Sequence, residues 1–568
     1  MRYSFVGERK EIGAHYTPKL LADFVAESIV SALPDSFQRK NIRVLDPAVG
    51  DGELLCSILE VFDNSNFYDF NIHGFDTDKD AIELAKNRVS NSFPGISLTL
   101  RNDNFLEFAI KKQRQLSLFA KNDLERFEVV IANPPYVRTQ IMGAGQSQKL
   151  AKQFNLSGRV DLYHAFIQGI AQVLYPGGIA GIIVSNRFLS TKSGAGVRHG
   201  ILAEFDVMHI WDMGDTRLFK AAVLPAVLLL RKKNGERLLN PSRFTSIYSS
   251  KNNGPVEITK NIITALDKAG IVKTKNGEFF HVRQGNLEYG DNPKNVWRIA
   301  NIESEQWLAT VAGNTFCKFD DIGKIRVGVK TTADKVFIRK DWDDFQEDER
   351  PELLKPVTTH HVARRYKAKQ SEIQKKIVYP HTVVQDRRIV VNLDEYPKSG
   401  KYLENHRDIL EARTYVLEAG RQWYEIWVPQ DPNAWGQPKI VFRDIAENPT
   451  FWMDTSGSVV NGDCYWIACK KPQQSELLWL ILAIGNSTFI EKFYDHCFNN
   501  KLYAGRRRFI TQYVKDFPLP DPETELSARI IETTKKIYDL LPSGGISELE
   551  DQLDLMVWQA FGFNHKNL

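Results

Sequence analysis

The chain has 568 residues, a length that suggests two or three domains. Its residues are 43% hydrophobic and 25% charged, which is the composition of an ordinary soluble protein. A formal net charge of +4 is mildly basic and does not by itself establish a nucleic-acid partner. No apolar run is long enough to span a membrane, the N-terminus carries no apolar signal segment, and the five cysteines show neither zinc-ligand spacing nor a disulfide pattern; these features predict a reducing, cytoplasmic setting.

The first motif is a strand, a glycine turn and a helix. A short apolar strand ends at Asp46, a turn with Gly50 and Gly52 follows, and Leu54–Phe62 predicts a helix. Glycines at this place let the backbone approach a ligand closely at a helix N-terminus. The acidic Asp46 and Asp51 disfavour a phosphate there, so the turn favours a ligand with cationic or hydroxyl groups.

Polar residues follow two further strands. Ile72–Phe75 predicts a strand that ends at Asp76, and an acidic residue at the end of the second strand typically binds ribose hydroxyls. After a predicted helix over Ala81–Arg88 and a strand over Ile96–Arg101, the residues Asn102–Phe105 can flank an adenine ring and bind its edge. In this order and at this spacing, the motifs predict a ligand that contains a nucleoside.

A fourth strand, Val129–Ala132, stops at Asn133-Pro134-Pro135-Tyr136. The two prolines end the strand and remove two N–H donors, so the turn is rich in acceptors. The Asn133 side-chain oxygen and the Pro134 carbonyl can accept both hydrogens of a planar NH2 group, and Tyr136 offers a ring face beside them. A nucleobase flipped out of a duplex needs this combination. Taken alone, the four residues could also be an ordinary turn after a strand.

Together these segments resemble the gamma class of S-adenosylmethionine-dependent amino-group DNA methyltransferases, the TaqI-like and Eco57I-like adenine enzymes. That class has a cofactor lid first, here residues 13–18, then the glycine turn, then the Asn-Pro-Pro-Tyr motif. The resemblance covers residues 10–235 and implies an α/β, doubly wound, Rossmann-like methyltransferase domain over residues 1–235. Later segments that resemble its motifs are Asp161–Phe166, Gly177–Ile179, Ile182–Asn186 and Arg217–Phe219.

The resemblance implies roles for particular residues. Asn133, Pro134, Pro135 and Tyr136 would be catalytic, and Tyr136 and Phe219 would stack on the flipped base. The implied cofactor is S-adenosylmethionine, with S-adenosylhomocysteine as the product and no metal. The class commonly has Asp before the aromatic that flanks the cofactor adenine, whereas Asn104 stands here beside Asp103, so either could contact that ring. The implied cofactor-binding residues are Tyr16, Thr17, Pro18, Asp46, Ala48, Gly50, Gly52, Asp76, Asp103, Asn104 and Phe105.

After about residue 235 the regular alternation of strands and helices is lost. A helix is predicted near Glu257–Ala269, and a mixed α+β domain follows. This half resembles, more loosely, the target recognition domain of the same class, which implies a DNA recognition domain with C-terminal helices over residues 236–568. The strand-like runs are Lys324–Lys330, Val336–Ile338, Lys376–Tyr379, Arg388–Asn392, Lys439–Arg443 and Tyr465–Ala468, and the predicted final helices are Glu525–Leu541 and Ser547–Phe561.

A basic stretch near the end of this half carries Arg506, Arg507 and Arg508 beside a glycine and aromatic residues. Such a stretch predicts contacts to DNA phosphates or base edges. A solvated basic loop is the alternative.

The sequence therefore predicts a site-specific methyltransferase for the N6 amine of a flipped-out adenine in double-stranded DNA, in a prokaryotic cytoplasm. It would be the modification component of a restriction–modification system or a solitary enzyme, and a cognate restriction endonuclease would act separately. No cysteine follows a proline, which argues against a cytosine-carbon enzyme. The alternatives are a protein-glutamine N5-methyltransferase, which uses the same Asn-Pro-Pro-Tyr motif, and a catalytically silent DNA-binding subunit.

Overall fold

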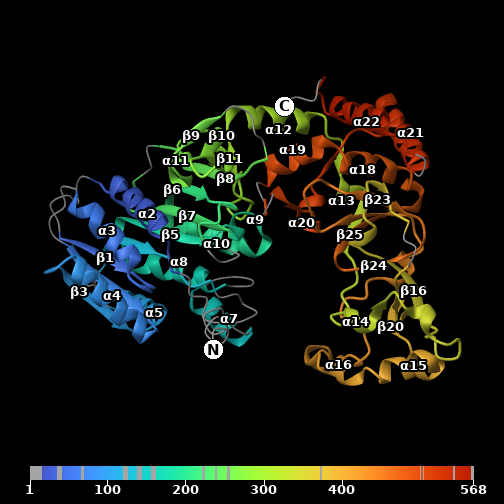
Figure 1. Cartoon of the computed structure of the whole chain (residues 1–568), viewed down its shortest axis with the longest axis horizontal. Coiled ribbons are helices and arrows are strands. Elements are labelled where there is room, and N and C mark those ends of the chain that lie inside the picture. Colours follow the sequence, from blue (N-terminus) through green and yellow to red (C-terminus); the bar gives the residue numbers. More distant parts are fainter. Residues whose placement is uncertain are drawn as a thin grey trace. The chain divides into compact units, whose positions relative to one another are not determined.

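The computed structural model divides into two compact units, which are described separately (Figure 1). The first unit contains residues 1–302 with 497–505, and the second contains residues 303–496 with 506–568. The structure describes residues 16–34, 41–64, 70–118, 126–136, 144–154, 161–219, 224–236, 240–251, 256–370, 374–498, 501–502, 505–541 and 544–564.

A mixed sheet of twelve strands forms the centre of the first unit, in the order β3-β2-β1-β4-β5-β7-β6-β8-β11-β10-β9, with β12 paired to β11. The strands from β3 to β5 are parallel, and β7 is antiparallel to both of its neighbours. The chain reverses its direction across the sheet between β1 and β4, which is the switch point of a doubly wound fold. The predicted fold class is therefore confirmed.

The strands of this sheet are β1 (Ile42–Asp46), β2 (Phe70–Asp76), β3 (Ser97–Asn102), β4 (Phe127–Ala132), β5 (Leu174–Ser185), β6 (Phe205–Asp212), β7 (Pro225–Lys232), β8 (Arg243–Ser249), β9 (Glu257–Thr259), β10 (Gly270–Thr274), β11 (Phe279–Glu288) and β12 (Arg298–Ala300). The helices of the unit are α2 (Lys19–Ala32), α3 (Glu53–Asp63), α4 (Lys79–Ser92), α5 (Phe105–Leu118), α7 (Ala144–Gln153), α8 (Leu162–Val173), α9 (Arg187–Ser190), α10 (Ala195–Glu204) and α11 (Ile262–Ala265).

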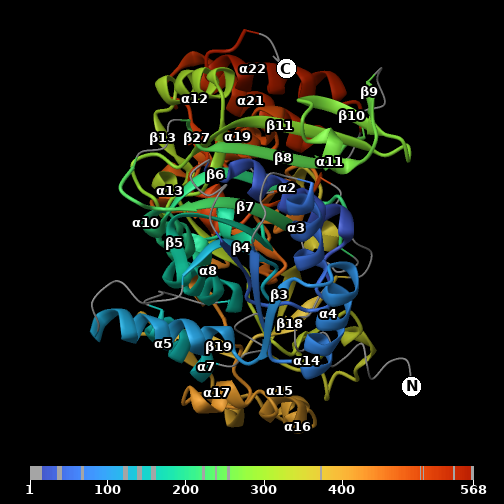
Figure 2. The same ribbon diagram turned by 90° about the vertical axis from the view of Figure 1, so that its left-hand side faces the viewer.

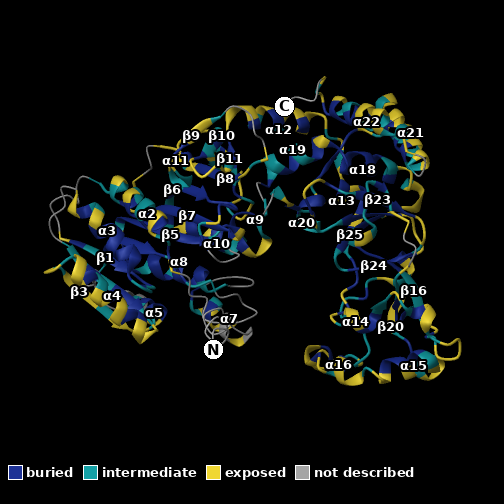
Figure 3. Ribbon diagram, viewed as in Figure 1, coloured by how far each residue is buried: buried dark blue, intermediate teal, exposed yellow. Residues whose placement is uncertain are grey.

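Helices cover both faces of the central strands, so these strands are buried on both sides (Figures 2 and 3). Successive side chains of β4 alternate between two apolar cores. Val129 and Ile131 pack with α2, α3 and α4, whereas Val130 and Ala132 pack with α5, α8 and α10. A parallel strand covered on both faces reads as a continuous apolar run, which is why Val129–Ala132 was recognisable in the sequence.

An ion pair stabilises the register of the central strands β1 and β4. Leu45 of β1 faces Val130 of β4. Arg43 donates from Nε and Nη2 to the two carboxylate oxygens of Glu128, at 3.1 and 2.7 Å. Glu128 is only 6% exposed, so its carboxylate depends on this partner. The pair holds β1 and β4 together at the end of the strands that lies away from the glycine turn.

The first unit extends beyond the predicted domain boundary at residue 235, because β8 pairs with β6 and continues the same sheet. Within this extension the predicted helix Glu257–Ala269 is wrong. Glu257–Thr259 pairs with β10 as a strand, and only Ile262–Ala265 is helical, begun by a capping box between Asn261 and Thr264. No helix among the described residues is long and apolar enough to cross a membrane.

The second unit is a mixed α+β structure, as predicted. A five-stranded sheet has the order β14-β25-β21-β23-β17, and a four-stranded sheet has the order β15-β18-β16-β24. Its core is rich in tryptophan, with Trp342, Trp452 and Trp466 almost fully buried. The predicted strand Val336–Ile338 is wrong: α14 covers Asp334–Phe337, and β15 begins at Ile338.

The strands of the second unit are β13 (Cys317–Lys318), β14 (Gly323–Val327), β15 (Ile338–Arg339), β16 (Leu354–Thr358), β17 (Tyr366–Lys367), β18 (Lys376–Val378), β19 (His381–Val384), β20 (Arg387–Val390), β21 (Lys439–Arg443), β22 (Ile445–Ala446), β23 (Phe451–Asp454), β24 (Val459–Val460), β25 (Cys464–Cys469), β26 (Arg507–Arg508) and β27 (Pro518–Leu519). The helices are α12 (Ile302–Gly313), α13 (Phe319–Ile322), α14, α15 (Pro397–Glu404), α16 (Arg407–Glu411), α17 (Thr414–Glu418), α18 (Leu477–Gly485), α19 (Thr488–Cys497), α20 (Thr511–Val514), α21 (Glu525–Leu540) and α22 (Ser547–Ala560).

The glycine turn yields a stability prediction. Gly52 precedes α3 at φ +81°, and an added Cβ would lie 3.1 Å from Ala85 of α4. We expect Gly52→Ala to lower the free energy of unfolding by about 1–3 kcal/mol, because a left-handed backbone and a close contact both oppose the side chain. Gly95→Ala is the matched control, since Gly95 has φ +90° but open space around it. If urea denaturation gives the same loss of unfolding free energy for Gly52→Ala and Gly95→Ala, packing against α4 contributes nothing to the effect.

Candidate active site

A cavity of about 380 Å³ opens at the carboxyl ends of the central parallel strands, on the side where the chain crosses between β1 and β4. Ligands of doubly wound sheets bind at this place because the loops there diverge and leave a crevice. The sequence-predicted residues that line the cavity are Tyr16, Ala48, Gly50, Asp76, Asp103, Asn104, Phe105, Asn133, Pro134, Pro135 and Tyr136.

Asp76, at the end of β2, is held in place by two backbone donors. Gly50 N donates to its Oδ2 and Asp78 N donates to its Oδ1, each at 2.9 Å. The first bond joins the glycine turn to the carboxylate across 26 residues of sequence. Each oxygen keeps further lone pairs, so the carboxylate can also accept from ligand hydroxyls.

Asp103 and Asn104 differ in what their side chains do. The Asn104 side-chain oxygen accepts from Leu106 N at 2.9 Å and caps the start of α5. Asp103 accepts from Asn104 N at 2.8 Å through one oxygen, and it is exposed. The remaining acceptor capacity of this pair therefore lies mostly with Asp103. Phe105 follows them, 2% exposed, and packs against Phe166 of α8.

Four of the predicted cofactor-binding residues do not line the cavity: Thr17, Pro18, Asp46 and Gly52. Asp46 is fully buried, and its Oδ1 accepts from Ala48 N at 2.9 Å. Burial, together with repulsion from Asp76 and Asp51, raises the pKa of the Asp46 carboxyl to about 8 against the opposing bond from Ala48. The Asp46 side chain therefore holds the backbone at the start of the glycine turn.

Asp51 faces helix α4 rather than the cavity. Arg88 of α4 donates to its carboxylate at 3.1 Å and also pairs with Glu53 at the start of α3. The negative charge that the cavity offers a ligand therefore comes from Asp76, Asp103 and Glu107, which line it, and not from Asp51.

The Asn-Pro-Pro-Tyr turn meets the N-terminal segment inside the same unit. The Asn133 amide nitrogen donates to Thr17 Oγ1 at 3.0 Å, so the amide oxygen points away from Thr17. Pro18 follows as the residue before α2. The Tyr16 ring lies 3.6 Å from the position that a Cβ on Gly50 would take, so it covers the glycine turn closely. Residues 13–15 of the predicted cofactor lid lie outside the described residues.

The Tyr136 hydroxyl is buried, and this burial raises the pKa of the phenol well above its ordinary value. Tyr163 of α8 is also buried with a raised pKa, and the two phenols interact electrostatically. Tyr136 therefore stays neutral and presents a ring to the cavity rather than a titrating group.

Phe219 does not reach this cavity. It is 6% exposed and belongs to the apolar core that includes residues of α2 and α3. The loop that carries it is held at its start by the buried Asp212, which accepts from Tyr248 Oη at 2.7 Å and from Asn186 Nδ2 at 2.9 Å. Arg217, two residues before Phe219, has φ +55°, an uncommon conformation for a residue that is not glycine.

Sequence reasoning assigned no site residue to one side of the cavity, although it marked Asp161–Phe166 as a motif segment. Leu162 and Phe166 of α8 line it, as do Lys149 and Gln153 of α7. The members of each pair are four residues apart and therefore lie on one helix face. That spacing was visible in the sequence, but nothing in it indicated which face turns toward a ligand.

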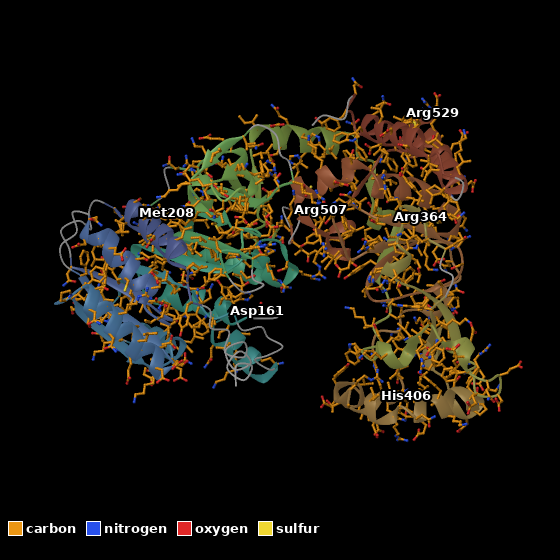
Figure 4. All side chains as sticks on the ribbon, viewed as in Figure 1. Asp161, Met208, Arg364, His406, Arg507 and Arg529 are labelled. Atoms are coloured by element: carbon orange, nitrogen blue, oxygen red, sulfur yellow. The ribbon has the colours of Figure 1, made fainter. Side chains whose placement is uncertain are left out.

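The three arginines near the C-terminus lie in different surroundings. Arg507, labelled in Figure 4, is 8% exposed and donates to both carboxylate oxygens of Asp495 at 2.8 and 2.9 Å. Arg508 pairs in the same way with Asp444, at 3.0 and 2.7 Å. Arg506 is exposed. The structure thus uses two of the three arginines to hold β26 within the second unit.

Two family models match the chain. An "Eco57I restriction-modification methylase" model matches residues 70–219, and a "TaqI-like C-terminal specificity domain" model matches residues 366–519. The first match contains the strand ends that build the cavity, from Asp76 to the Asn-Pro-Pro-Tyr turn. The second match lies within the second unit except for residues 497–505, which belong to the first unit.

Similar proteins extend over nearly the whole chain. The type II methyltransferase M.BanIII of Aneurinibacillus aneurinilyticus is 38% identical and covers 98% of both chains. The type II methyltransferase M.BstVI of Geobacillus stearothermophilus is 25% identical over 90% of both. Among solved structures, the type IIL restriction-modification enzyme MmeI in complex with DNA shares the fold, with a TM-score of 0.64, 13% identity, and 99% of this chain and 77% of that chain covered.

The buried Asp46 carboxyl predicts a pH-dependent stability. Its folded-state pKa of about 8 lies above the unfolded value, so the folded protein keeps a proton that the unfolded chain has released. The carboxyl therefore costs stability progressively as pH rises from about 4 toward 8. We expect the free energy of unfolding, measured with urea, to fall less between pH 6 and pH 8 in Asp46→Asn than in the wild type. Asp80→Asn, an exposed change of the same charge, should keep the wild-type slope.

Proposed function

Because the chain belongs to the type II DNA methyltransferases of restriction–modification systems, we propose that it transfers a methyl group from S-adenosylmethionine to the N6 amine of an adenine in double-stranded DNA. One observation carries the proposal: the acceptor-rich edge of Asn133 and Pro134 shares a single cavity with the Asp76 carboxylate. The Asn133 and Pro134 oxygens can accept hydrogen bonds from a reacting amine, and the Asp76 carboxylate can accept them from the ribose of a nucleoside cofactor.

The cavity fits S-adenosylmethionine by the chemistry of its lining. Asp76 is oriented by two backbone N–H groups and can accept from ribose hydroxyls. Asp103 is the better acceptor for the adenine amine of the cofactor, because Asn104 caps α5. The carboxylates of the lining suit a ligand that carries positive charge. Bound there, S-adenosylmethionine supplies an electrophilic methyl group on its sulfonium.

The target amine is a poor nucleophile because its lone pair is delocalised into the adenine ring. Hydrogen bonds from its two hydrogens to the Asn133 side-chain oxygen and the Pro134 carbonyl localise electron density on the nitrogen and fix its direction. Thr17 contributes by holding the Asn133 amide nitrogen, so that the oxygen is the atom turned toward a substrate. Catalysis is then positioning and preorganised electrostatics, without a covalent enzyme intermediate.

An adenine in a duplex must leave the stack to reach this cavity. Tyr136 lines the cavity and is the ring that we assign to stacking on the flipped base. Phe219 would join it only after residues 213–219 rearrange, because its ring is packed in the core.

DNA sequence is read, in this proposal, by the second unit, which contains most of the match to a TaqI-like specificity domain. The functional division therefore lies after the sheet is complete and not at residue 235, because β8–β12 belong to the catalytic sheet. Among the three C-terminal arginines, Arg506 is the one that we retain as a phosphate contact, since Arg507 and Arg508 are engaged in ion pairs.

The competing functions are less well supported. A protein-glutamine methyltransferase would have no use for a specificity domain of this kind, whereas one matches here over residues 366–519. A catalytically silent subunit is disfavoured because Asn133 and Tyr136 both line the cavity with the cofactor-side residues.

The amine clamp gives a direct test. We expect Asn133→Ala to lower methyl transfer to DNA by about 10²–10³-fold while S-adenosylmethionine binding stays near the wild-type value, because one preorganised acceptor is lost. Single-turnover methylation and calorimetry measure the two effects. Unchanged transfer by Asn133→Ala would refute the assigned chemistry.

Thr17→Val tests the orienting hydrogen bond without changing the shape of the side chain. The loss of one neutral hydrogen bond should reduce the methylation rate by roughly 2–13-fold, a smaller effect than loss of Asn133 itself. A Thr17→Ser variant restores the hydroxyl and should recover most of the rate. A Thr17→Val loss as large as that of Asn133→Ala would mean that Thr17 acts directly on the substrate.

The cofactor assignment is tested at Asp76. We expect Asp76→Ala to weaken S-adenosylmethionine by about 1–3 kcal/mol, since hydrogen-bonded groups lose their partner. DNA affinity measured without the cofactor should hardly change. An unaltered cofactor affinity in calorimetry would move the ribose contact to another residue.

A further inference from the structure

The hairpin of β19 and β20 stands apart from the other sheets of the second unit. Within the described part of the chain the two strands pair only with each other, with Val384 opposite Arg387 at the tip. All residues from Val384 to Ile389 are exposed. The hairpin lies inside the match to the TaqI-like specificity domain, but its residues play no part in the site described above.

One face of the hairpin is hydrogen-bonded to the rest of the second unit. Ile426 N donates to His381 Nε2 at 3.1 Å, and burial with the nearby Arg388 lowers the pKa of His381 to about 3, so this nitrogen stays an acceptor. Arg388 Nη1 donates to the Gln430 carbonyl at 3.0 Å. One face of the hairpin is thereby held, and only its other face and its tip remain available.

The outward face carries a basic and apolar surface. Because side chains alternate along a strand, Thr382, Val384, Arg387 and Ile389 share the face opposite His381 and Arg388. Val384 is 50% exposed and Ile389 is 42% exposed. The Arg387 side chain makes no ion pair or hydrogen bond with any of the residues that the structure describes. An unpaired guanidinium between two exposed β-branched residues is typical of a surface that binds a partner.

The turn itself has an unusual sequence. Gln385 and Asp386 both have positive φ, +49° and +59°, which is the two-residue turn that usually carries Asn-Gly. Residues with larger side chains cost stability in this conformation. Their side chains are exposed at the tip, where neither packing nor a hydrogen bond among the described residues accounts for them. The strain points to a role outside the folding of the chain.

We propose that the β19–β20 hairpin enters the major groove of DNA and reads bases there, with Arg387 as a specificity-determining residue. A two-stranded ribbon fits this groove. The tip offers the matching chemistry: an arginine fork for guanine, a glutamine amide for adenine, a carboxylate for the cytosine amine, and apolar groups for thymine methyls. The proposal rests on the proposed function, since it names which residues of a DNA methyltransferase select its sequence.

The test compares the methylated sequence motif of variants with that of the wild type. Each protein is expressed in cells that lack other adenine methylation, and methylated positions are mapped by single-molecule sequencing of their DNA. Arg387→Ala should lose selectivity at one base pair of the motif by about ten- to a hundredfold. Arg387→Lys should lose it nearly as much, because lysine keeps the charge but not the two-pronged fork. Arg529→Ala on α21 (Figure 4), another exposed arginine, should leave the motif unchanged.

The turn variant Gln385→Asn with Asp386→Gly separates reading from stability. Relief of the strained turn should raise the melting temperature by roughly 2–4 °C. The methylated motif should nevertheless relax or change. A more stable protein with an unaltered motif would overturn the proposal for the turn residues.

The remaining outcomes also decide the matter. If Arg387→Lys restores full activity while Arg387→Ala weakens all sequences equally, Arg387 is a phosphate contact and base reading is refuted. If motif and DNA affinity are unchanged but self-association in sedimentation is altered, the face binds protein instead. If the wild type methylates no motif at all, the proposed function fails. If the wild type and every variant methylate the same motif, the proposed function stands and the role of the hairpin is refuted.

Discussion

The parallel pairing of β1 with β2 on one side and with β4 on the other is the constraint on which the site depends. Asp46 pairs with Gly74, so Asp76 lies two residues further along β2; Leu45 pairs with Val130, so Asn133 lies three residues beyond that level. A slip of one residue would exchange the two faces of a strand and move its apolar side chains to the wrong core. The Arg43–Glu128 ion pair opposes such a slip from the far end of β1 and β4.

The acceptors that this edge collects are oriented by other parts of the chain before any ligand arrives. Backbone N–H groups hold Asp76 and Asp103, and the Thr17 hydroxyl holds the Asn133 amide. Groups fixed in this way need no reorganisation when charge moves during a reaction. Some of these hydrogen bonds join neighbouring residues, such as Asn104 and Asp103, whereas the bond between Asn133 and Thr17 joins residues more than a hundred positions apart. Together they preorganise the site.

The sequence was sufficient where local chemistry and strand order determine position. Buried parallel strands have a recognisable apolar pattern, and their polar C-terminal ends must meet at one edge, so Asp76 and Asn133 could be placed in one site. It was not sufficient for Arg507 and Arg508, whose acidic partners Asp495 and Asp444 lie 12 and 64 residues away. The strand Glu257–Thr259 was missed because its pairing with β10 overrides a helix-like local pattern.

The continuation of the sheet through β8 also determines where the chain can be divided. A fragment that ends near residue 235 would remove β8 and leave β6 with an open edge, although Val207, Ile210 and Trp211 of that strand are almost fully buried. An unpaired apolar edge of this kind is a template for aggregation between molecules. A soluble catalytic fragment therefore has to retain the strands up to Ala300, so protein engineers who exchange recognition domains should place the junction after the sheet is complete.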